Sequence, residues 1–153
     1  MISNIVGRQK NDLMRDLSSF GSLLFYILVM ILSLLLQNYS LFYRLLIGLV
    51  IIYIITIILR IIFFKERPMK LKHESFIEKL DAASFPSLHA TRSAFMCLIF
   101  INYFNNAILS MLMFLLVISI AYSRIYLKKH DIRDVVAGLI IGIIIYFGIN
   151  LIL

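Results

Sequence analysis

The sequence predicts an all-α fold: an integral membrane helix bundle of about five spanning helices, plus an N-terminal interfacial amphipathic helix. Hydrophobic residues make up 62% of the chain, against about 45–50% in soluble domains. Three runs carry no charged residue, namely Leu17–Tyr43, Ser93–Ser123 and Val135–Leu153. About 20 apolar residues cross a bilayer as a helix, so we expect residues 1–153 to form a single multi-pass domain of the cell membrane.

The N-terminal stretch 1–18 is expected to form the interfacial helix. Its apolar residues recur at roughly helical spacing between polar ones, a pattern typical of helices that lie on a membrane surface. The first two spans are predicted at about 18–37 and 41–65, separated by the short polar turn QNYS. A polar loop at 66–85 follows, and its charged residues, with His73, are interpreted as solvated.

The apolar stretch 87–124 has to be divided. As one helix it would be roughly 56 Å long, far beyond the hydrocarbon core of a bilayer. The polar turn NYFNN at 102–106 separates two helices, predicted at about 87–103 and 107–125. The last span is predicted at about 130–152. Counting the crossings then predicts that three polar stretches meet at one face of the membrane, namely Arg60–Pro68, Pro86–Arg92 and Ser123–Asp134.

Small side chains in the apolar runs are interpreted as packing residues. Gly138 and Gly142 form a G-x-x-x-G step in the last helix, and such steps let two helices approach closely. Cys97 is the only cysteine, so the chain has no intrachain disulfide. We expect the Cys97 side chain to be buried as a small apolar group.

The first polar stretch, RIIFFKERP at 60–68, contains two arginines and a proline. Arg60 and Arg67 are seven residues apart, so two helical turns would put both on nearly the same face. Pro68 disfavours helix at the preceding residue and is expected to end the helix there. Two guanidiniums on one face suit an oxyanion such as phosphate. The alternative is that both arginine side chains extend along the helix so that their charged ends lie at the membrane interface.

The second stretch, SFPSLHATR at 84–92, has the features of a helix start. Pro86 suits the first turn of a helix, where the backbone N–H groups of Ser87, Leu88 and His89 would point outward and favour an anion. His89 would stand where a proton donor to a leaving oxygen is needed. Taken alone, His89 is equally well explained as an interfacial residue.

The third stretch, SRIYLKKHDIRD at 123–134, gathers charge near the end of an apolar chain. His130 and Asp134 are spaced i,i+4 at the predicted start of the last helix, so the carboxylate could accept from one ring nitrogen while the other faces the site. An imidazole oriented in this way is a competent nucleophile. Arg124 ends the preceding helix at the same face. The alternative is an ordinary basic loop between two spans.

Together the three stretches resemble the phosphatidic acid phosphatase type 2 superfamily. The pattern of that superfamily is Lys-x6-Arg-Pro, then Pro-Ser-Gly-His, then Ser-Arg-x5-His-x3-Asp. The corresponding residues here are Arg60-x6-Arg67-Pro68, Pro86-Ser87-Leu88-His89 and Ser123-Arg124-x5-His130-x3-Asp134. The resemblance covers about 60–142. Arg60 replaces the usual lysine and Leu88 the usual glycine, and neither change removes a catalytic atom.

The resemblance implies a metal-independent phosphatase that works through a phosphohistidine and needs no cofactor. It implies that His130 attacks phosphorus, that Asp134 holds its tautomer and that His89 protonates the leaving oxygen. The phosphoryl oxygens would be bound by Arg60, Arg67, Ser87, Leu88 and Arg124. Apart from His130 and Asp134, the sequence has no cluster of carboxylates or histidines with metal-ligand spacing, so no metal site is predicted.

The membrane setting favours a lipid phosphate as substrate, and family analogy favours a polyprenyl diphosphate. A phosphatidate or related glycerophospholipid phosphate also fits, and so does transfer of the phosphoryl group to an acceptor other than water. A non-catalytic membrane protein is the least favoured reading, because His89, His130 and Asp134 are all present.

The charge distribution excludes one class of partner and predicts an orientation. The formal net charge is +7, but the basic residues cluster at helix ends, and no soluble basic domain is available to bind nucleic acid. Of 15 Lys and Arg, only Arg44 is predicted on the far side of the membrane. The positive-inside rule therefore predicts that the N-terminus and the active face are cytoplasmic. Membrane lipids and the lipid substrate are the expected partners, and no oligomeric state is predicted.

Overall fold

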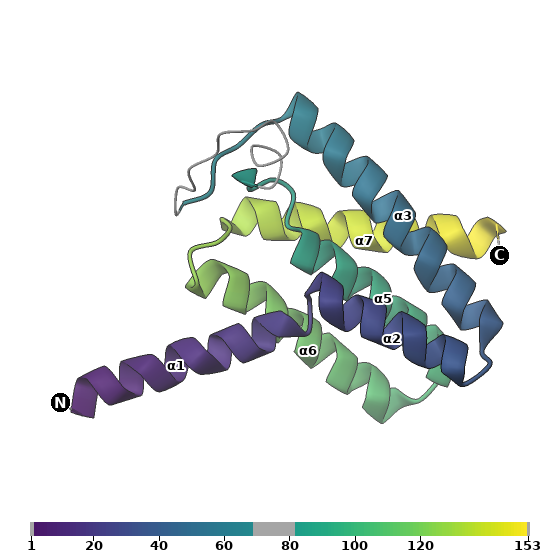
Figure 1. The fold of residues 1–153 in the computed structure, drawn as a ribbon, viewed down its shortest axis with the longest axis horizontal. Coiled ribbons are helices and arrows are strands. Elements are labelled where there is room, and N and C mark those ends of the chain that lie inside the picture. The colour runs from purple at the N-terminus through teal and green to yellow at the C-terminus, as the bar shows by residue number, and fades with distance from the viewer. Residues whose placement is uncertain (1, 69–81, 153) are drawn as a thin grey trace.

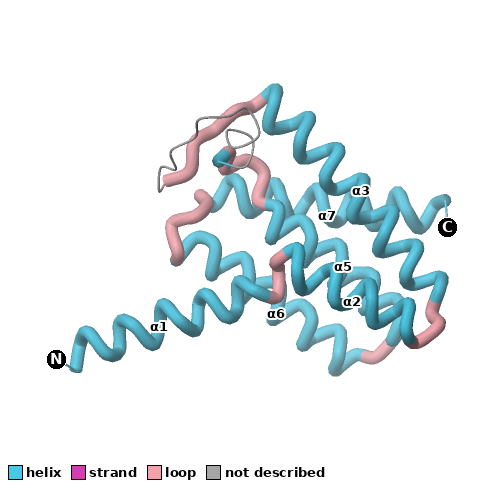
Figure 2. Tube along the Cα trace, in the orientation of Figure 1, coloured by secondary structure: helices cyan, strands magenta, loops and turns pink. Residues whose placement is uncertain are grey.

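The computed structural model describes residues 2–68 and 82–152, and it confirms the all-α class (Figure 1; Figure 2). The described chain forms six helices: α1 (Ile2–Ser19), α2 (Leu23–Leu35), α3 (Tyr39–Ile62), α5 (Leu88–Phe104), α6 (Ala107–Tyr126) and α7 (Ile132–Ile152). The loop residue His73 and the lysines around it lie outside the described residues.

Helix α5 lies at the centre of the bundle and contacts α3, α6 and α7 (Figure 1). Phe95 of α5 is buried in a core shared with Leu45 and Ile52 of α3 and Ile145 of α7. Helix α2 closes this core with Tyr26, whose hydroxyl donates to the Leu45 carbonyl at 2.8 Å. That bond satisfies a polar group that would otherwise be buried without a partner.

Fewer helices qualify as spans than the sequence predicted. Three of the described helices, α3, α6 and α7, are long and apolar enough to cross a membrane, and a fourth span is obtained if α1 and α2, bent by 43°, count as one broken span. The other two are shorter: α2 has 13 residues and α5 has 17. Their lengths are about 20 and 26 Å, below the ~30 Å of the hydrocarbon core. By length and composition, the described helices therefore give three or four candidate spans, where the sequence predicted about five.

The predicted first span, 18–37, is interrupted between α1 and α2. Ser22 begins α2 as its N-cap, and its side chain accepts from the Phe25 N–H at 3.1 Å. Gly21 lies directly against α5, because a Cβ at this position would be 3.2 Å from the His89 Cβ. The interruption thus lets the chain make a close contact with the start of α5.

The division at the NYFNN turn is confirmed. Helix α5 ends at Phe104, and Asn105 follows in the left-handed region with φ 44, which asparagine adopts more readily than most residues. Asn106 is the N-cap of α6, and its side chain accepts from the Leu109 N–H at 3.0 Å. Both residues suit the turn for reasons that are local to the sequence.

The close packing predicted for the G-x-x-x-G step is also present. A Cβ on Gly138 would lie 2.6 Å from the Ser87 carbonyl oxygen, and one on Gly142 would lie 2.5 Å from the Thr91 carbonyl oxygen. Neither position has room for a side chain. The first turns of α7 and α5 are consequently held in direct contact.

Helix α3 ends at Ile62, earlier than the predicted residue 65. Residues 63–68 leave the helix and run beside the segment that precedes α5, where the Ser84 N–H donates to the Lys65 carbonyl at 2.7 Å and Glu66 pairs with Ala83 in an antiparallel bridge. The prediction that Arg67 shares a helix face with Arg60 is therefore wrong. Arg67 returns to the same region through this extended segment.

Candidate active site

A cavity of about 330 Å³ lies at the end of the bundle where α3 ends and α5 begins. We call it the arginine cavity, and its lining residues are Leu23, Tyr53, Arg60, Arg67, Leu88, His89, Arg92, Arg124 and His130. Among the described residues, this lining contains four guanidiniums and two imidazoles and no carboxylate. Such a lining suits an anionic ligand with several oxygens.

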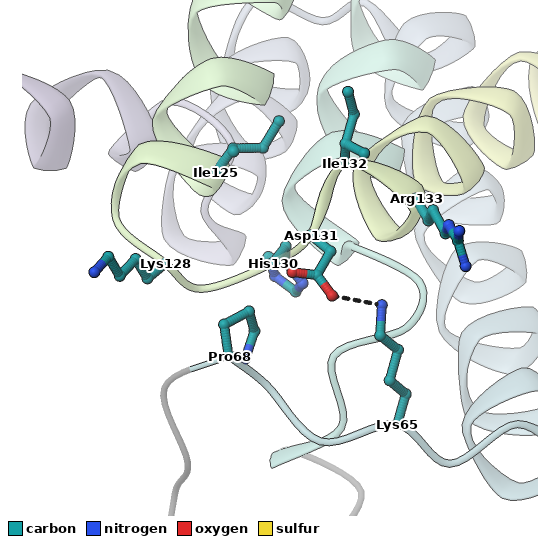
Figure 3. A pocket seen from close by; sticks show the side chains of 8 residues that line it. All are labelled: Lys65, Pro68, Ile125, Lys128, His130, Asp131, Ile132 and Arg133. Atoms are coloured by element: carbon teal, nitrogen blue, oxygen red, sulfur yellow. Dashed lines mark ion pairs between the residues drawn. The ribbon is translucent and has the colours of Figure 1, made fainter.

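Residues from all three predicted stretches meet here, as the count of crossings predicted. Six of the eight predicted site residues line the arginine cavity: Arg60, Arg67, Leu88, His89, Arg124 and His130. The other two, Ser87 and Asp134, are fully buried behind this lining. His130 also lines a second cavity of about 510 Å³, in which Lys65, Pro68 and Asp131 lie around it (Figure 3). The assembly of these residues is observed, and their chemical roles stay predictions.

Two arginines of the cavity, Arg92 and Arg124, are held by neutral groups of distant segments. Arg124, buried at the end of α6, donates from Nη1 to the Ser18 hydroxyl at 2.6 Å. Ser18 belongs to the last turn of α1, so the N-terminal helix reaches the cavity. Arg60 is also buried, although it lies in the last turn of a candidate span. Burial of a guanidinium is costly unless a partner offsets its charge.

The start of α5 differs from its prediction in one respect. Ser87 is the N-cap and Pro86 precedes the helix, so the first helical N–H groups are those of Leu88 and His89. The N–H of Ser87 does not point outward as predicted; it donates to the Asp134 carbonyl at 3.0 Å. The close approach of α7 at Gly138 brings this carbonyl within reach.

The orientation of His130 also differs from its prediction. Helix α7 begins at Ile132, so His130 lies in the preceding turn and the i,i+4 geometry of a helix does not apply. Its Nδ1 is 4.0 Å from the nearer Asp134 oxygen, too far for a hydrogen bond. Nδ1 instead donates to the Ser84 carbonyl at 2.8 Å. A carbonyl only accepts, so the proton sits on Nδ1 and Nε2 is the basic nitrogen.

The surroundings of His130 keep its ring neutral. Burial lowers the pKa of His130, and the positive charges of Arg124 and Arg67 lower it further, to about 3, although the Ser84 carbonyl and Asp134 act in the opposite direction. A neutral ring with its proton fixed on Nδ1 has a lone pair on Nε2 across the neutral pH range. That is the form in which a histidine acts as a nucleophile.

Asp134 is the centre of a hydrogen-bond network around His130. Its carboxylate accepts from the Ser84 hydroxyl, from the Asp131 N–H at 3.0 Å and from the Lys65 ammonium at 2.6 Å. Lys65 also pairs with Asp131 at 2.9 Å (Figure 3). Burial alone would lower the pKa of Lys65, but its hydrogen bonds to the two carboxylates raise it above its ordinary value. Ser84 therefore connects the two predicted catalytic residues, through its carbonyl to His130 and through its hydroxyl to Asp134.

Sequence reasoning assigned no role to several residues of the site: Ser18, Tyr53, Lys65, Ser84 and Arg92. Lys65 lies within the unspecified positions between Arg60 and Arg67, and Ser84 lies two residues before Pro86. Each acts through a contact with a residue far away in the chain, which no local spacing reveals. Only Arg92 carried a usable signal, as a charged residue at the start of an apolar run.

Comparison with known proteins identifies the family and shows a shared fold. The PAP2 superfamily profile matches residues 41–153, and so includes every predicted site residue. The fold is similar to the crystal structure of LpxE from Aquifex aeolicus, with a TM-score of 0.76 and 19% identity over 93% of this chain and 86% of that chain. It is also similar to the first transmembrane PAP2 type phosphatidylglycerolphosphate phosphatase from Bacillus subtilis, with a TM-score of 0.66 and 18% identity over 94% and 76% of the two chains. The profile match spans well over half of the chain, which therefore belongs to the PAP2 superfamily.

Proposed function

We propose that this membrane-embedded PAP2-type lipid phosphate phosphatase hydrolyses a polyprenyl diphosphate or a similar lipid phosphate through a phosphohistidine on His130. The observation that carries the proposal is the arginine cavity, which brings four guanidiniums around an imidazole with a defined tautomer. Phosphoryl transfer needs a positioned nucleophile and stabilisation of the charge on the phosphoryl oxygens. We assign both functions to residues that line this cavity.

In the first step, Nε2 of His130 attacks phosphorus while the bond to the leaving oxygen breaks and His89 gives that oxygen a proton. Burial and the charges of Arg124 and Arg92 hold the pKa of His89 far below its ordinary value, so we propose that the proton arrives with the substrate, whose negative charge opposes those arginines. Arg60, Arg67 and Arg124 bind the non-bridging oxygens, together with the Leu88 N–H at the start of α5. Phosphorylated His130 carries a positive charge on its ring, because Nδ1 keeps its proton. Asp134, whose carboxylate lies 4.0 Å from Nδ1, stabilises that charge as an ion pair rather than through a direct hydrogen bond.

In the second step, water attacks the phosphohistidine and His89 accepts its proton, which releases orthophosphate and restores His130. We assign to Ser87 a hydrogen bond to the bound phosphoryl group, and this role is supported by its buried hydroxyl, which has no partner among the described residues. No step in this sequence draws on a metal ion.

Phosphate release from a panel of lipid phosphates and diphosphates, with chelator present, tests the proposal. The wild type should release phosphate and His130→Asn should not, while Asn106→Ser, at the other end of the bundle, should behave as the wild type. A phosphorylated protein that is labile to acid and stable to base should accumulate on rapid quenching. Wild-type turnover that survives in His130→Asn would rule out this mechanism.

A second candidate substrate class is supported by the fold comparison. The similar structure from Bacillus subtilis is a phosphatidylglycerolphosphate phosphatase, so glycerophospholipid phosphates, phosphatidate included, belong in the panel. Product analysis also separates hydrolysis from phosphotransfer, since only the latter yields a phosphorylated acceptor without free phosphate. A complete lack of turnover on every lipid would favour a non-catalytic role.

We further propose that the active face is cytoplasmic, on the strength of the basic residues at that face. Lys128→Cys introduces an exposed thiol beside the site, and the native Cys97 is buried. In intact cells an impermeant thiol reagent should label Lys128→Cys only after permeabilisation. Labelling of intact cells would place the site on the outer face.

A further inference from the structure

Ser18 is a buried polar residue beside the arginine cavity that the proposed reaction does not use. It lies in the last turn of α1 and is 5% exposed. Its hydroxyl accepts from Nη1 of Arg124 at 2.6 Å. The match to the PAP2 profile begins at residue 41, so Ser18 lies outside the part of the chain that the family profile describes.

The bond between Ser18 and Arg124 joins two segments that are far apart in the sequence. The two residues are separated by 106 positions. Helix α1 leads into the bundle from outside and packs on α6, the helix that carries Arg124 (Figure 1). The bond therefore connects the last turn of the N-terminal helix to a side chain that lines the arginine cavity.

The backbone that carries Ser18 is fixed in place by the junction between α1 and α2. The Gly21 N–H donates to the Ser18 carbonyl at 3.1 Å, and the Gly21 carbonyl accepts from Nε and Nη2 of Arg92 at 3.2 and 3.0 Å. A Cβ on Gly21 would lie 2.9 Å from Cγ2 of Ile120 and 3.2 Å from the His89 Cβ. The junction is thus held against α5 and α6, so Ser18 is a firm point of attachment.

The side chain of Arg124 needs such an attachment. It is long and has several rotatable bonds, and it binds a phosphoryl group well only when the plane of its guanidinium faces the oxygens. Arg124 is 8% exposed, and its Nε has no partner among the described residues. Ser18 therefore holds one end of the guanidinium and leaves donors for a ligand.

We propose that Ser18 is a positioning residue for the reaction, whose hydroxyl holds the Arg124 guanidinium in the orientation that binds the phosphoryl oxygens. This inference rests on the proposed function, which assigns Arg124 to the phosphoryl group. Without the hydroxyl, only a fraction of the molecules would present the guanidinium correctly, and affinity falls with that fraction. The rate falls as well, because the phosphoryl oxygens must be stabilised during transfer.

The neighbouring Ser19 provides a matched control. Ser19 is exposed, and its hydroxyl donates to the Asp16 carbonyl of the same helix at 2.6 Å. Ser18→Ala and Ser19→Ala remove the same atom from adjacent positions of α1, but only Ser18→Ala breaks a bond to the arginine cavity.

Two measurements on the full chain in detergent test the proposal. Binding of inorganic phosphate is read as a rise in the thermal unfolding temperature. Cys97 is the only cysteine of the chain and is buried, so a thiol-reactive fluorescent dye reports unfolding. The second measurement is kcat and KM on the lipid phosphate that the wild type hydrolyses.

Ser18→Ala should weaken phosphate binding and lower kcat/KM by about tenfold each, the usual effect of one hydrogen bond to a charged group. Ser19→Ala should behave as the wild type. A lower unfolding temperature in Ser18→Ala with unchanged phosphate affinity and kcat/KM would overturn the proposal, because the bond would then serve stability alone. If Ser18→Ala does not fold, Ser18→Thr and Ser18→Val replace it, since they are similar in size and differ in the hydroxyl. Equal phosphate affinity in these two variants would also overturn the proposal.

A double-mutant cycle tests whether Ser18 acts through Arg124. In an Arg124→Gln background, adding Ser18→Ala should change the phosphate affinity little, because the group that Ser18 positions is already absent. A further loss of about tenfold in the double variant would show that the two residues act independently. That outcome would contradict the positioning role.

Turnover separates this inference from the proposed function. A wild type that binds phosphate through Ser18 and Arg124 but hydrolyses no lipid would contradict the proposed reaction and leave the positioning of Arg124 standing. A wild type that hydrolyses a lipid phosphate, with the same kcat and KM in Ser18→Ala, would contradict the role of Ser18 and leave the phosphatase standing. A wild type that neither binds phosphate nor hydrolyses any lipid would overturn both.

Discussion

At the end of the bundle away from the arginine cavity, each turn is capped by an asparagine of the turn itself, although Asn38 also donates to Tyr103 and Arg44 to Asn150. At the cavity end, the polar groups of the site are bound by distant segments. Asn38 and Asn106 each accept from the N–H three residues later. At the cavity end, by contrast, His130 bonds to Ser84 and Arg124 bonds to Ser18. The comparison shows that local contacts set where the helices end at the far turns, whereas distant contacts set the geometry of the site.

The two ends also differ in what a substitution would disturb. A change in an asparagine cap removes one exposed local bond. A change near the cavity acts on groups that several helices hold together, as when Asp134 binds Lys65, Ser84 and Asp131 at once. We therefore expect effects at the cavity end to extend to activity and effects at the far end to be confined to stability.

The largest effect is expected from Gly138→Leu, which would separate the first turns of α5 and α7. A Cβ at this position already meets the Ser87 carbonyl oxygen at 2.6 Å, whereas a Cβ at Gly148, in the same helix, has nothing within 4 Å. Overpacking against backbone should cost about 3 kcal/mol or more and abolish phosphate release. Gly148→Leu should leave the free energy of unfolding and the rate of phosphate release unchanged. Unfolding and turnover measurements on the two variants check this. Similar behaviour of the two variants would show that this helix contact does not hold the site together.

The next effect is a loss of stability in acid that depends on His130. In the folded protein its pKa is about 3, against an ordinary value of 6.5. Between these values the unfolded chain binds the proton and the folded chain does not, so stability falls as the pH falls below about 6.5. From pH 7.5 to pH 4.5 this group should account for about 2–3 kcal/mol.

Unfolding free energies of the wild type and His130→Asn at the two pH values measure this contribution. The variant should lose less stability in acid than the wild type by that amount. An identical loss in both proteins would mean that His130 titrates near its ordinary pKa, which would contradict the buried neutral ring.

Lys65→Gln should lower kcat by about tenfold. It removes the ammonium that pairs with Asp134 at 2.6 Å and with Asp131 at 2.9 Å. A charged hydrogen bond contributes about 1.5–3 kcal/mol, and partial exposure of Lys65 places the effect at the lower end, which is about tenfold in rate. Lys65→Arg keeps a cation at this position and should restore most of the rate. Arg8→Gln is the matched control, because it removes a cation from an exposed position in α1. Full activity in Lys65→Gln would show that Ser84 and the Asp131 N–H suffice to position Asp134.

The fold at the far end could be predicted because its determinants are local. The NYFNN turn divided two helices at the observed place, since an asparagine tolerates the left-handed conformation and the next one caps a helix. The crossings then predicted that Arg60, His89 and His130 would meet. Charge patterns and caps act over a few residues, so one sequence is enough to find them.

The details of the cavity end could not be predicted because they depend on backbone atoms of other segments. The i,i+4 spacing of His130 and Asp134 favoured a direct hydrogen bond between their side chains. The helix starts only at Ile132, however, and Nδ1 of His130 donates to the Ser84 carbonyl instead. Every residue has a carbonyl, so no sequence pattern marks the one that binds. The same holds for Arg92, whose partner is the carbonyl of Gly21.

The smallest effect is expected from Asn106→Ala, at the far end. The side chain of Asn106 accepts from the Leu109 N–H at 3.0 Å, and loss of such a cap costs about 1 kcal/mol. The unfolding temperature should fall while kcat and KM stay at their wild-type values, because no group of the arginine cavity contacts this turn. Asn106→Ser keeps a capping oxygen and should restore the stability. A fall in kcat in Asn106→Ala at a temperature where the protein is fully folded would mean that the two ends are coupled through α5 and α6.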